Sequence, residues 1–237
     1  MDFTLLKDFL TESGITLKEG AFSQLETFYG FLTEKNKVMN LTAITEEKDV
    51  MIKHYIDSLS GAALIKELAG ETFSLIDVGC GAGFPGIPLK TAFPEAEFIL
   101  LDSLNKRINF VNEAASLLGL KNLTGVAARA EDFAAGENRE SFDICVSRAV
   151  ADAKVLLEYC LPFVKVGGCC VLYKSDYKEE MSQASKALEI LGGEISDVKS
   201  LTLPDGSLRS LVIIKKVSPT PSKYPRRAGK PSKSPIQ

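Results

Sequence analysis

The residues most able to do chemistry in this sequence form a glycine-rich segment that follows an acidic residue. Residues 77–86 read Asp-Val-Gly-Cys-Gly-Ala-Gly-Phe-Pro-Gly, directly after an apolar stretch and before a predicted helix. Glycine lets a backbone approach a ligand closely, and parallel sheets bind ligands at the carboxyl ends of their strands. We therefore predict that Gly79, Gly81 and Gly83 hold a small molecule.

Acidic residues around this segment indicate which molecule it holds. The glycine spacing alone also fits the dinucleotide pattern G-x-G-x-x-G. However, Asp77 suits an amino group or a cation better than a pyrophosphate. Asp102 ends the next apolar run, from where a carboxylate binds ribose hydroxyls, although it could also cap the following helix. The third run ends in Ala-Arg-Ala-Glu-Asp at 128–132, which could hold an adenine edge. Together these positions favour S-adenosylmethionine over NAD.

The end of the fourth apolar run bears on the acceptor. Enzymes that methylate an exocyclic amine usually carry Asp/Asn-Pro-Pro-aromatic there, whereas residues 145–149 read Cys-Val-Ser-Arg-Ala. Carbon-5 methylation needs a cysteine nucleophile in a loop, but Cys145 lies inside the apolar run. An acceptor that already offers a lone pair, such as purine N7, remains. Such a reaction needs no general base, because alignment of the reactants and exclusion of water lower the barrier.

The elements that must position these residues alternate between short apolar runs and helical stretches. We predict strands over 73–79, 97–102, 123–128, 142–147 and 168–174, and helices or turns over 88–93, 106–118, 131–135 and 153–164. A helix over 178–191 precedes two further strands, 194–203 and 207–217, joined by the turn Pro-Asp-Gly. The fold class is therefore α/β. We expect a Rossmann-like, mostly parallel seven-stranded sheet that ends in an antiparallel hairpin.

The chain divides into three segments. Residues 1–70 are predicted to form a helical N-terminal extension, because apolar residues recur there at steps of three and four. Residues 71–217 form the Rossmann-like domain, and residues 218–237 form a basic, Pro-rich C-terminal segment. Seven of the 28 basic residues lie after residue 214, where no acidic residue occurs, so the rest has a net charge of −10. The C-terminal segment either attracts polyphosphate or is a disordered, solubilising end.

Composition excludes several classes of protein. Hydrophobic residues make up 45% of the 237 residues and charged residues 25%, and no apolar run approaches the roughly 20 residues of a membrane-spanning helix. The N-terminal residues have no signal-peptide layout, so we expect a cytoplasmic protein. The five cysteines include no C-x-x-C pair and there is one histidine. We therefore expect no metal. Cys145, Cys169 and Cys170 lie in apolar stretches, and we expect them to pack as small buried side chains.

Several motifs together carry a family resemblance across nearly the whole chain. They are Asn-Leu-Thr-Ala-Ile at 40–44, His-Tyr-Ile-Asp-Ser-Leu at 54–59, the glycine segment with its continuation at 77–88, Leu-Asp-Ser at 101–103 with Lys-Arg at 106–107, Arg-Ala-Glu at 129–131, Val-Ser-Arg-Ala-Val-Ala at 146–151 and Lys-Tyr-Pro-Arg-Arg at 223–227. In this order they resemble the RsmG family, also called the glucose-inhibited division protein B family of bacterial ribosomal RNA methyltransferases.

The resemblance implies a fold, a reaction and a set of contacts. The fold would be that of class I methyltransferases that use S-adenosylmethionine. The reaction would transfer the methyl group to N7 of one guanine in 16S rRNA of the small ribosomal subunit. The residues suggested as cofactor contacts are Gly79, Phe84, Ala130, Glu131 and Arg148.

Basic residues and the only histidine are the remaining candidates. Arg148 either pairs with a carboxylate or faces the cofactor and the target base, because an isolated charge there is costly to bury. His54 either positions the structure or the RNA, or takes part in the reaction, so Arg148 and His54 are the catalytic candidates. The residues predicted to contact RNA are Lys106, Arg107, Lys223, Arg226 and Arg227. We expect the protein to be a monomer.

Two alternatives from other functional classes remain open on the sequence. The glycine spacing also suits an NAD-dependent oxidoreductase, which NAD and not S-adenosylhomocysteine would stabilise against heat. A non-catalytic RNA-binding nucleotide sensor would bind RNA without turnover.

Overall fold

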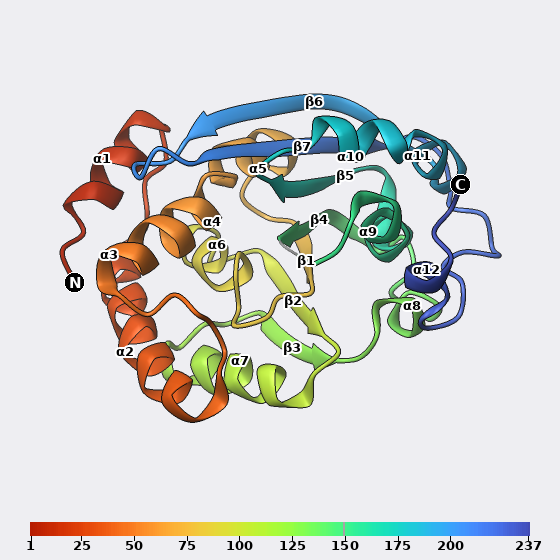
Figure 1. The fold of residues 1–237 in the computed structure, drawn as a ribbon. Helices are drawn as coiled ribbons and strands as arrows, with labels where there is room; N and C mark the ends of the chain where they lie inside the picture. The colour runs from red at the N-terminus through yellow and green to blue at the C-terminus, as the bar shows by residue number, and fades with distance from the viewer. Residues whose placement is uncertain (149) are drawn as a thin grey trace.

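A mixed sheet of seven strands forms the centre of this computed structural model, which describes residues 1–148 and 150–237 (Figure 1). The strand order is β3-β2-β1-β4-β5-β7-β6; β1 to β5 are parallel, and β7 runs antiparallel to both its neighbours. The strands are β1 (Ser74–Val78), β2 (Glu97–Asp102), β3 (Leu123–Ala127), β4 (Phe142–Arg148), β5 (Val164–Lys174), β6 (Gly193–Thr202) and β7 (Leu208–Lys216). The predicted fold class is confirmed.

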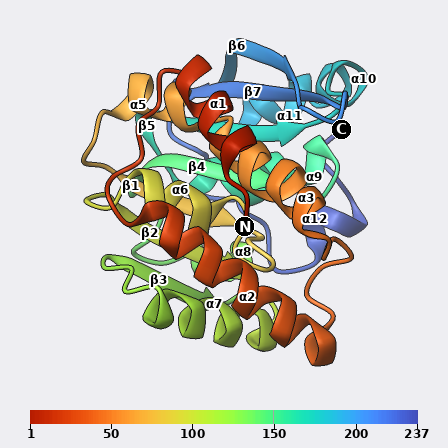
Figure 2. The same cartoon turned by 90° about the vertical axis from the view of Figure 1, so that its left-hand side faces the viewer.

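Helices cover both faces of this sheet (Figures 1 and 2). The N-terminal helices are α1 (Thr4–Glu12), α2 (Ala21–Met39), α3 (Glu47–Val50), the π-helix η1 (Met51–Ile56), α4 (Asp57–Leu59) and α5 (Ala62–Ala69). Those that follow are α6 (Gly86–Ala92), α7 (Asn105–Leu117), α8 (Ala130–Phe133), α9 (Ala153–Cys160), the 3₁₀-helix η2 (Leu161–Phe163), α10 (Lys178–Gln183), α11 (Ser185–Leu191) and α12 (Lys230–Lys233).

The side chains of each strand alternate between two apolar cores, one on each face of the sheet. On β4, Ile144 and Val146 belong to the first core, and Cys145 between them belongs to the second. The first core receives α1, α2, η1, α5, α6 and α7, and the second receives α9, α10 and α11. The N-terminal helices therefore share a core with the sheet: Leu25 and Phe28 of α2 are completely buried there.

The elements after β5 differ from the prediction in one place. The predicted hairpin is present, with Thr202 opposite Leu208 at its closed end. The single helix predicted over 178–191 is wrong, because Ala184, with φ −98° and ψ 3°, separates α10 from α11. Apolar spacing continues through this break, so the sequence pattern does not reveal it.

The C-terminal segment (residues 218–237) packs against the domain, so the disordered alternative is wrong. Tyr224 and Ile236 lie in the second core, and Pro231 at the start of α12 is buried. Arg139 donates to the backbone carbonyls of Thr220 and Tyr224 at 2.5 and 2.7 Å. Basic and Pro-rich composition indicates disorder only when nothing compensates the ordering entropy, and here buried polar contacts do so.

Among the described residues, no helix has the length and apolarity needed to cross a lipid bilayer.

Candidate cofactor and substrate site

The glycine segment forms a loop between β1 and α6 whose backbone requires glycine at two points. Gly79 has a φ of 76°, and a Cβ atom there would lie 2.4 Å from Cγ2 of Val150. Gly83 has a φ of 88°, and a Cβ atom there would lie 2.4 Å from Cδ1 of Ile87. The amide of Gly79 donates to the carbonyl of Leu101 at 2.8 Å, which ties the loop to the end of β2. The loop is thus fixed against the sheet.

A pocket of about 360 Å³ lies beside this loop, at the carboxyl ends of β1, β2 and β3. We call it the glycine-loop pocket, and its volume is in the range of small-molecule sites. It is lined by Val78, Gly79, Leu101, Asp102, Ser103, Arg107, Ala128, Arg129, Ala130, Glu131, Val150 and Tyr159. Four residues predicted to bind the cofactor, Gly79, Asp102, Ala130 and Glu131, therefore meet at one pocket.

Asp102, the last residue of β2, orders its surroundings as well as lining the pocket. Its Oδ2 atom accepts hydrogen bonds from the amide of Gly81 and from Nη1 of Arg107, each at 3.1 Å. Its Oδ1 atom accepts from the amide of Leu104 at 2.9 Å. Gly81 does not line the pocket, and its contact with the pocket is through Asp102. Arg107, predicted to contact RNA, instead lines the pocket as the partner of Asp102.

The C-terminal segment holds Glu131 of α8 by a backbone hydrogen bond. Its Oε1 atom accepts a hydrogen bond from the amide of Gly229 at 2.8 Å, and the residue is 5% exposed. Tyr159 of α9 lines the same pocket and comes from the helix that packs against α8 and α12. This wall of the pocket is therefore built from α8 and α9, and the C-terminal segment supports both helices from outside the pocket.

Asp77 is fully buried at the end of β1, next to two lining residues. Its Oδ2 atom accepts from the amide of Gly86 at 2.9 Å, and its Oδ1 atom has no partner among the described residues. Burial raises the pKa of this carboxyl group to about 7. Because a buried acceptor without a partner is costly, the site fits a ligand that brings a positively charged amino group, as S-adenosylmethionine does.

A buried network of two arginines and one carboxylate lies on the other side of the loop. Nη1 of Arg148, at the end of β4, donates to Oδ2 of Asp57 at 2.7 Å and to the carbonyl of Lys53 at 2.9 Å. Arg209 of β7 donates to both oxygens of Asp57, at 2.5 and 3.0 Å. The Asp57 side chain is 1% exposed. Two guanidinium groups share one carboxylate, so the network keeps one net positive charge, which favours an anionic group nearby.

His54 connects this network to the glycine loop. Its Nδ1 atom lies 3.1 Å from Nη2 of Arg148, and its Nε2 atom lies 3.0 Å from Oγ1 of Thr42. The imidazole stacks on the ring of Phe84 with 4.1 Å between the ring centres. Burial, with the positive charge of Arg148, lowers the pKa of His54 to about 3. His54 belongs to the π-helix η1, a form that is frequent at functional sites.

The structure thus separates the predicted site residues into two adjoining groups. Gly79, Asp102, Ala130 and Glu131 line the glycine-loop pocket, and Gly81 is linked to it by its hydrogen bond to Asp102. Phe84 and Arg148, predicted to contact the cofactor, and His54 lie together in the second group and do not line the pocket. Gly83 belongs to neither group; it packs against Ile87 of α6.

Sequence reasoning missed Arg209 and Tyr159. Arg209 reaches Asp57 across 152 positions of sequence, from a strand whose sequence shows only an ordinary run of consecutive apolar residues. Tyr159 lies in a helix whose sequence gives no sign that it borders a pocket. Asp57 is different, because it stands within the His-Tyr-Ile-Asp motif and could have been named as the partner of a nearby cation.

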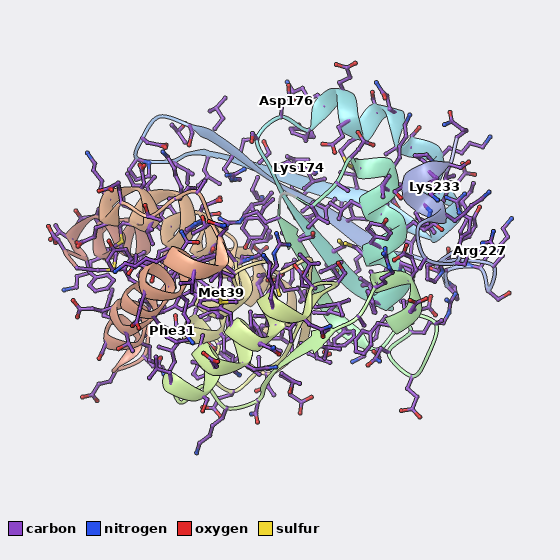
Figure 3. All side chains as sticks on the ribbon, turned by 60° about the horizontal axis from the view of Figure 1, so that its bottom comes forward. Phe31, Met39, Lys174, Asp176, Arg227 and Lys233 are labelled. Atoms are coloured by element: carbon purple, nitrogen blue, oxygen red, sulfur yellow. The ribbon has the colours of Figure 1, made fainter. Side chains whose placement is uncertain are left out.

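The basic side chains predicted to contact RNA differ in their exposure and in their contacts with the rest of the protein. Nζ of Lys106 donates to the carbonyl of Met39 at 3.3 Å, whereas Lys223 and Arg227 are exposed. Figure 3 shows where Arg227 and Lys233 lie on the C-terminal segment. Arg226, by contrast, is bound to the buried carboxylate of Glu158. Arg227, not Arg226, therefore presents its guanidinium to solvent.

Three of the five cysteines lie close together in the second core. The sulfur atoms of Cys145, Cys160 and Cys170 lie within 4.8 Å of one another, and all five cysteines are buried and unbridged. Structural zinc takes four ligands, and the described residues offer no fourth in this group. The predicted burial of Cys145, Cys169 and Cys170 is confirmed.

Comparisons with known proteins place this architecture in a family. The family profile described as rRNA small subunit methyltransferase G matches residues 21–209. The chain belongs to this family. It is 48% identical to the Ribosomal RNA small subunit methyltransferase G of Acetivibrio thermocellus, over 94% of this chain and 92% of that protein. It is also 48% identical to the Alkaliphilus metalliredigens protein of the same name, over 98% of each. The resemblance predicted from the motifs is confirmed.

Comparison with solved structures shows that this member of the methyltransferase G family has the class I methyltransferase fold. TYW2 of M. jannaschii, in complex with AdoMet, has a TM-score of 0.53 and 15% identity, over 68% of this chain and 76% of that one. The ribosomal protein L11 methylase of Lactobacillus delbrueckii subsp. bulgaricus has a TM-score of 0.51 and 17% identity, over 70% and 79%. The family profile ends at residue 209, so the C-terminal segment lies outside it.

Proposed function

We propose that this protein transfers a methyl group from S-adenosylmethionine to N7 of one guanine in 16S rRNA. One observation carries the proposal: in a chain of the methyltransferase G family, the ends of three consecutive parallel strands bring Gly79, Asp102 and Glu131 to one pocket. The family supplies the class of substrate, and the pocket supplies a place for the cofactor.

Each end of the cofactor has a counterpart among these residues. Asp102 would bind the ribose hydroxyls, and Ala130 with Glu131 would hold the adenine edge. The orphaned oxygen of Asp77 would attract the amino group, and the surplus positive charge beside Arg148 would attract the carboxylate. The bound cofactor supplies a methyl group on a positively charged sulfur, which makes it an activated electrophile.

The chain's own residues would align the reactants rather than move a proton. The lone pair of guanine N7 forms the new bond to carbon, the carbon–sulfur bond breaks, and the base gains the positive charge. No proton leaves in this step, so no general base is required. A histidine with a pKa of about 3, held by Arg148 and Thr42, fits a positioning role for His54.

RNA would approach beside the loop and along the exposed basic side chains. Lys106, Lys223 and Arg227 are the proposed phosphate contacts, because phosphate contacts supply most of the non-specific affinity for nucleic acid. A ribosomal acceptor also implies that the protein acts in the cytoplasm, and we propose that it does so as a monomer.

Methyl transfer in vitro tests the proposal. The protein is incubated with radiolabelled S-adenosylmethionine and either 30S subunits or bare 16S rRNA, and the labelled nucleoside is identified after digestion. The proposal expects 7-methylguanosine as the labelled product. RNA binding without any transfer in either acceptor would instead favour the non-catalytic sensor.

A further inference from the structure

A salt bridge between Arg226 and the buried carboxylate of Glu158 holds the C-terminal segment against the domain. Nε of Arg226 donates to Oε1 of Glu158 at 2.9 Å, and Nη2 donates to Oε2 at 2.5 Å. The backbone amide of Arg226 donates to the same Oε1 atom at 2.8 Å. The Glu158 side chain is completely buried. Removing one partner of such a pair leaves a buried charge, so this contact strongly favours one docked position of the segment.

This fastening point adjoins the glycine-loop pocket. Glu158 precedes Tyr159, which lines the pocket, and three residues after Arg226 the amide of Gly229 reaches Oε1 of Glu131. No described residue donates to Oε2 of Glu131, so the segment occupies one oxygen of this pocket-lining residue and leaves the other available to a ligand. Of the described residues, those of the segment itself do not line the pocket, so their influence is indirect.

We propose that the C-terminal segment positions Glu131 and Tyr159, so that its docking and cofactor binding favour each other. Arg226 and Glu158 are then positioning residues, and the amide of Gly229 is the contact through which they act. The inference rests on the proposed function for the identity of the cofactor. It goes beyond that function because it gives a part of the chain outside the family profile a role at the cofactor pocket.

The first test measures binding of S-adenosylhomocysteine, the reaction product, by titration calorimetry in the absence of RNA. Arg226→Ala is expected to weaken binding about tenfold, and Arg226→Lys, which keeps one charge, by less. Ile65→Ala is the matched control, because Ile65 is completely buried in the first core and its loss lowers the melting temperature without touching the segment. The control is expected to bind as the parent does.

The outcomes separate this inference from the function on which it rests. If the parent protein does not bind S-adenosylhomocysteine, the proposed cofactor is wrong. If the parent binds and folded Arg226→Ala binds equally well, the positioning role is wrong and the cofactor stands. A loss of affinity equal to that of Ile65→Ala would mean that only stability had changed, which also contradicts the inference.

The second test uses the unaltered protein and therefore does not depend on a variant that folds. Reciprocal coupling requires that the cofactor also favours the docked segment. Saturating S-adenosylhomocysteine is expected to slow tryptic cleavage after Arg226 and Arg227 at least fivefold more than cleavage after Lys121, in the turn between α7 and β3. Equal slowing at both places, or none, would overturn the inference.

Discussion

Arg148 donates a hydrogen bond to Nδ1 of His54 across 3.1 Å, and this contact determines the state of the only histidine in the chain. A guanidinium group has no acceptor, so Nδ1 must be unprotonated and Nε2 must carry the hydrogen, toward Oγ1 of Thr42. Protonation of Nδ1 would set two positive charges against each other in a buried site. The contact with Arg148 therefore favours the neutral form of the His54 imidazole.

We expect the imidazole of His54 to remain neutral from pH 8 down to pH 5. Its pKa is lowered to about 3, whereas an unfolded histidine titrates near 6.5, so protons favour the unfolded chain between these values. This group therefore removes up to about 1.4 kcal/mol of stability per pH unit as the pH falls through that window. Nitrogen-15 NMR of the single histidine measures its state directly. A titration near pH 6.5 in the folded protein would contradict the account.

Asp57→Ala is expected to destabilise the protein by about 3–5 kcal/mol, because it leaves the largely buried guanidinium groups of Arg148 and Arg209 without a counterion. Urea unfolding measures the change in the free energy of unfolding. Asp197→Ala is the matched control, since it breaks an exposed pair with Lys199 and should cost less than about 1 kcal/mol. Equal costs for the two variants would show that the buried network contributes no more than a surface pair.

Asp102→Ala is expected to weaken S-adenosylhomocysteine binding by about 1.5–3 kcal/mol, the scale of a hydrogen bond to a charged group. The variant also frees Arg107 and the amide of Gly81, which disorders the pocket side of the loop. Calorimetric titration measures the affinity, with Asp205→Ala in the β6–β7 turn as the control. Unchanged affinity would remove Asp102 from the cofactor site.

Arg227→Ala is expected to weaken binding of 16S rRNA and to reduce the slope of log affinity against log salt by about 1. The reason is that Arg227 is exposed, whereas Arg226 is held by Glu158. The measurement is RNA binding at several salt concentrations, with Lys199→Ala on β6 as a control of equal charge change. A slope identical to that of the parent would exclude a phosphate contact at Arg227.

The main features of the fold and one half of the site could be predicted from the sequence. Gly79, Asp102 and Glu131 follow three short apolar runs, and parallel strands must bring such positions to one edge. Local spacing therefore carries that part of the information.

The second half of the site depends on contacts between distant parts of the chain. Asp57 meets Arg209 only because β7 inserts between β5 and the edge strand β6. Arg226 meets Glu158 across 68 positions, and its basic, Pro-rich surroundings are typical of a disordered end. Neither pairing leaves a periodic signal, so the docked C-terminal segment could not be predicted from the sequence.

The most direct test of the central claim is a map of 7-methylguanosine in 16S rRNA from cells with and without this protein. The account predicts one guanine that carries the modification in the first case and loses it in the second, and that regains it when the parent protein is restored. Identical maps from the two kinds of cell would contradict it.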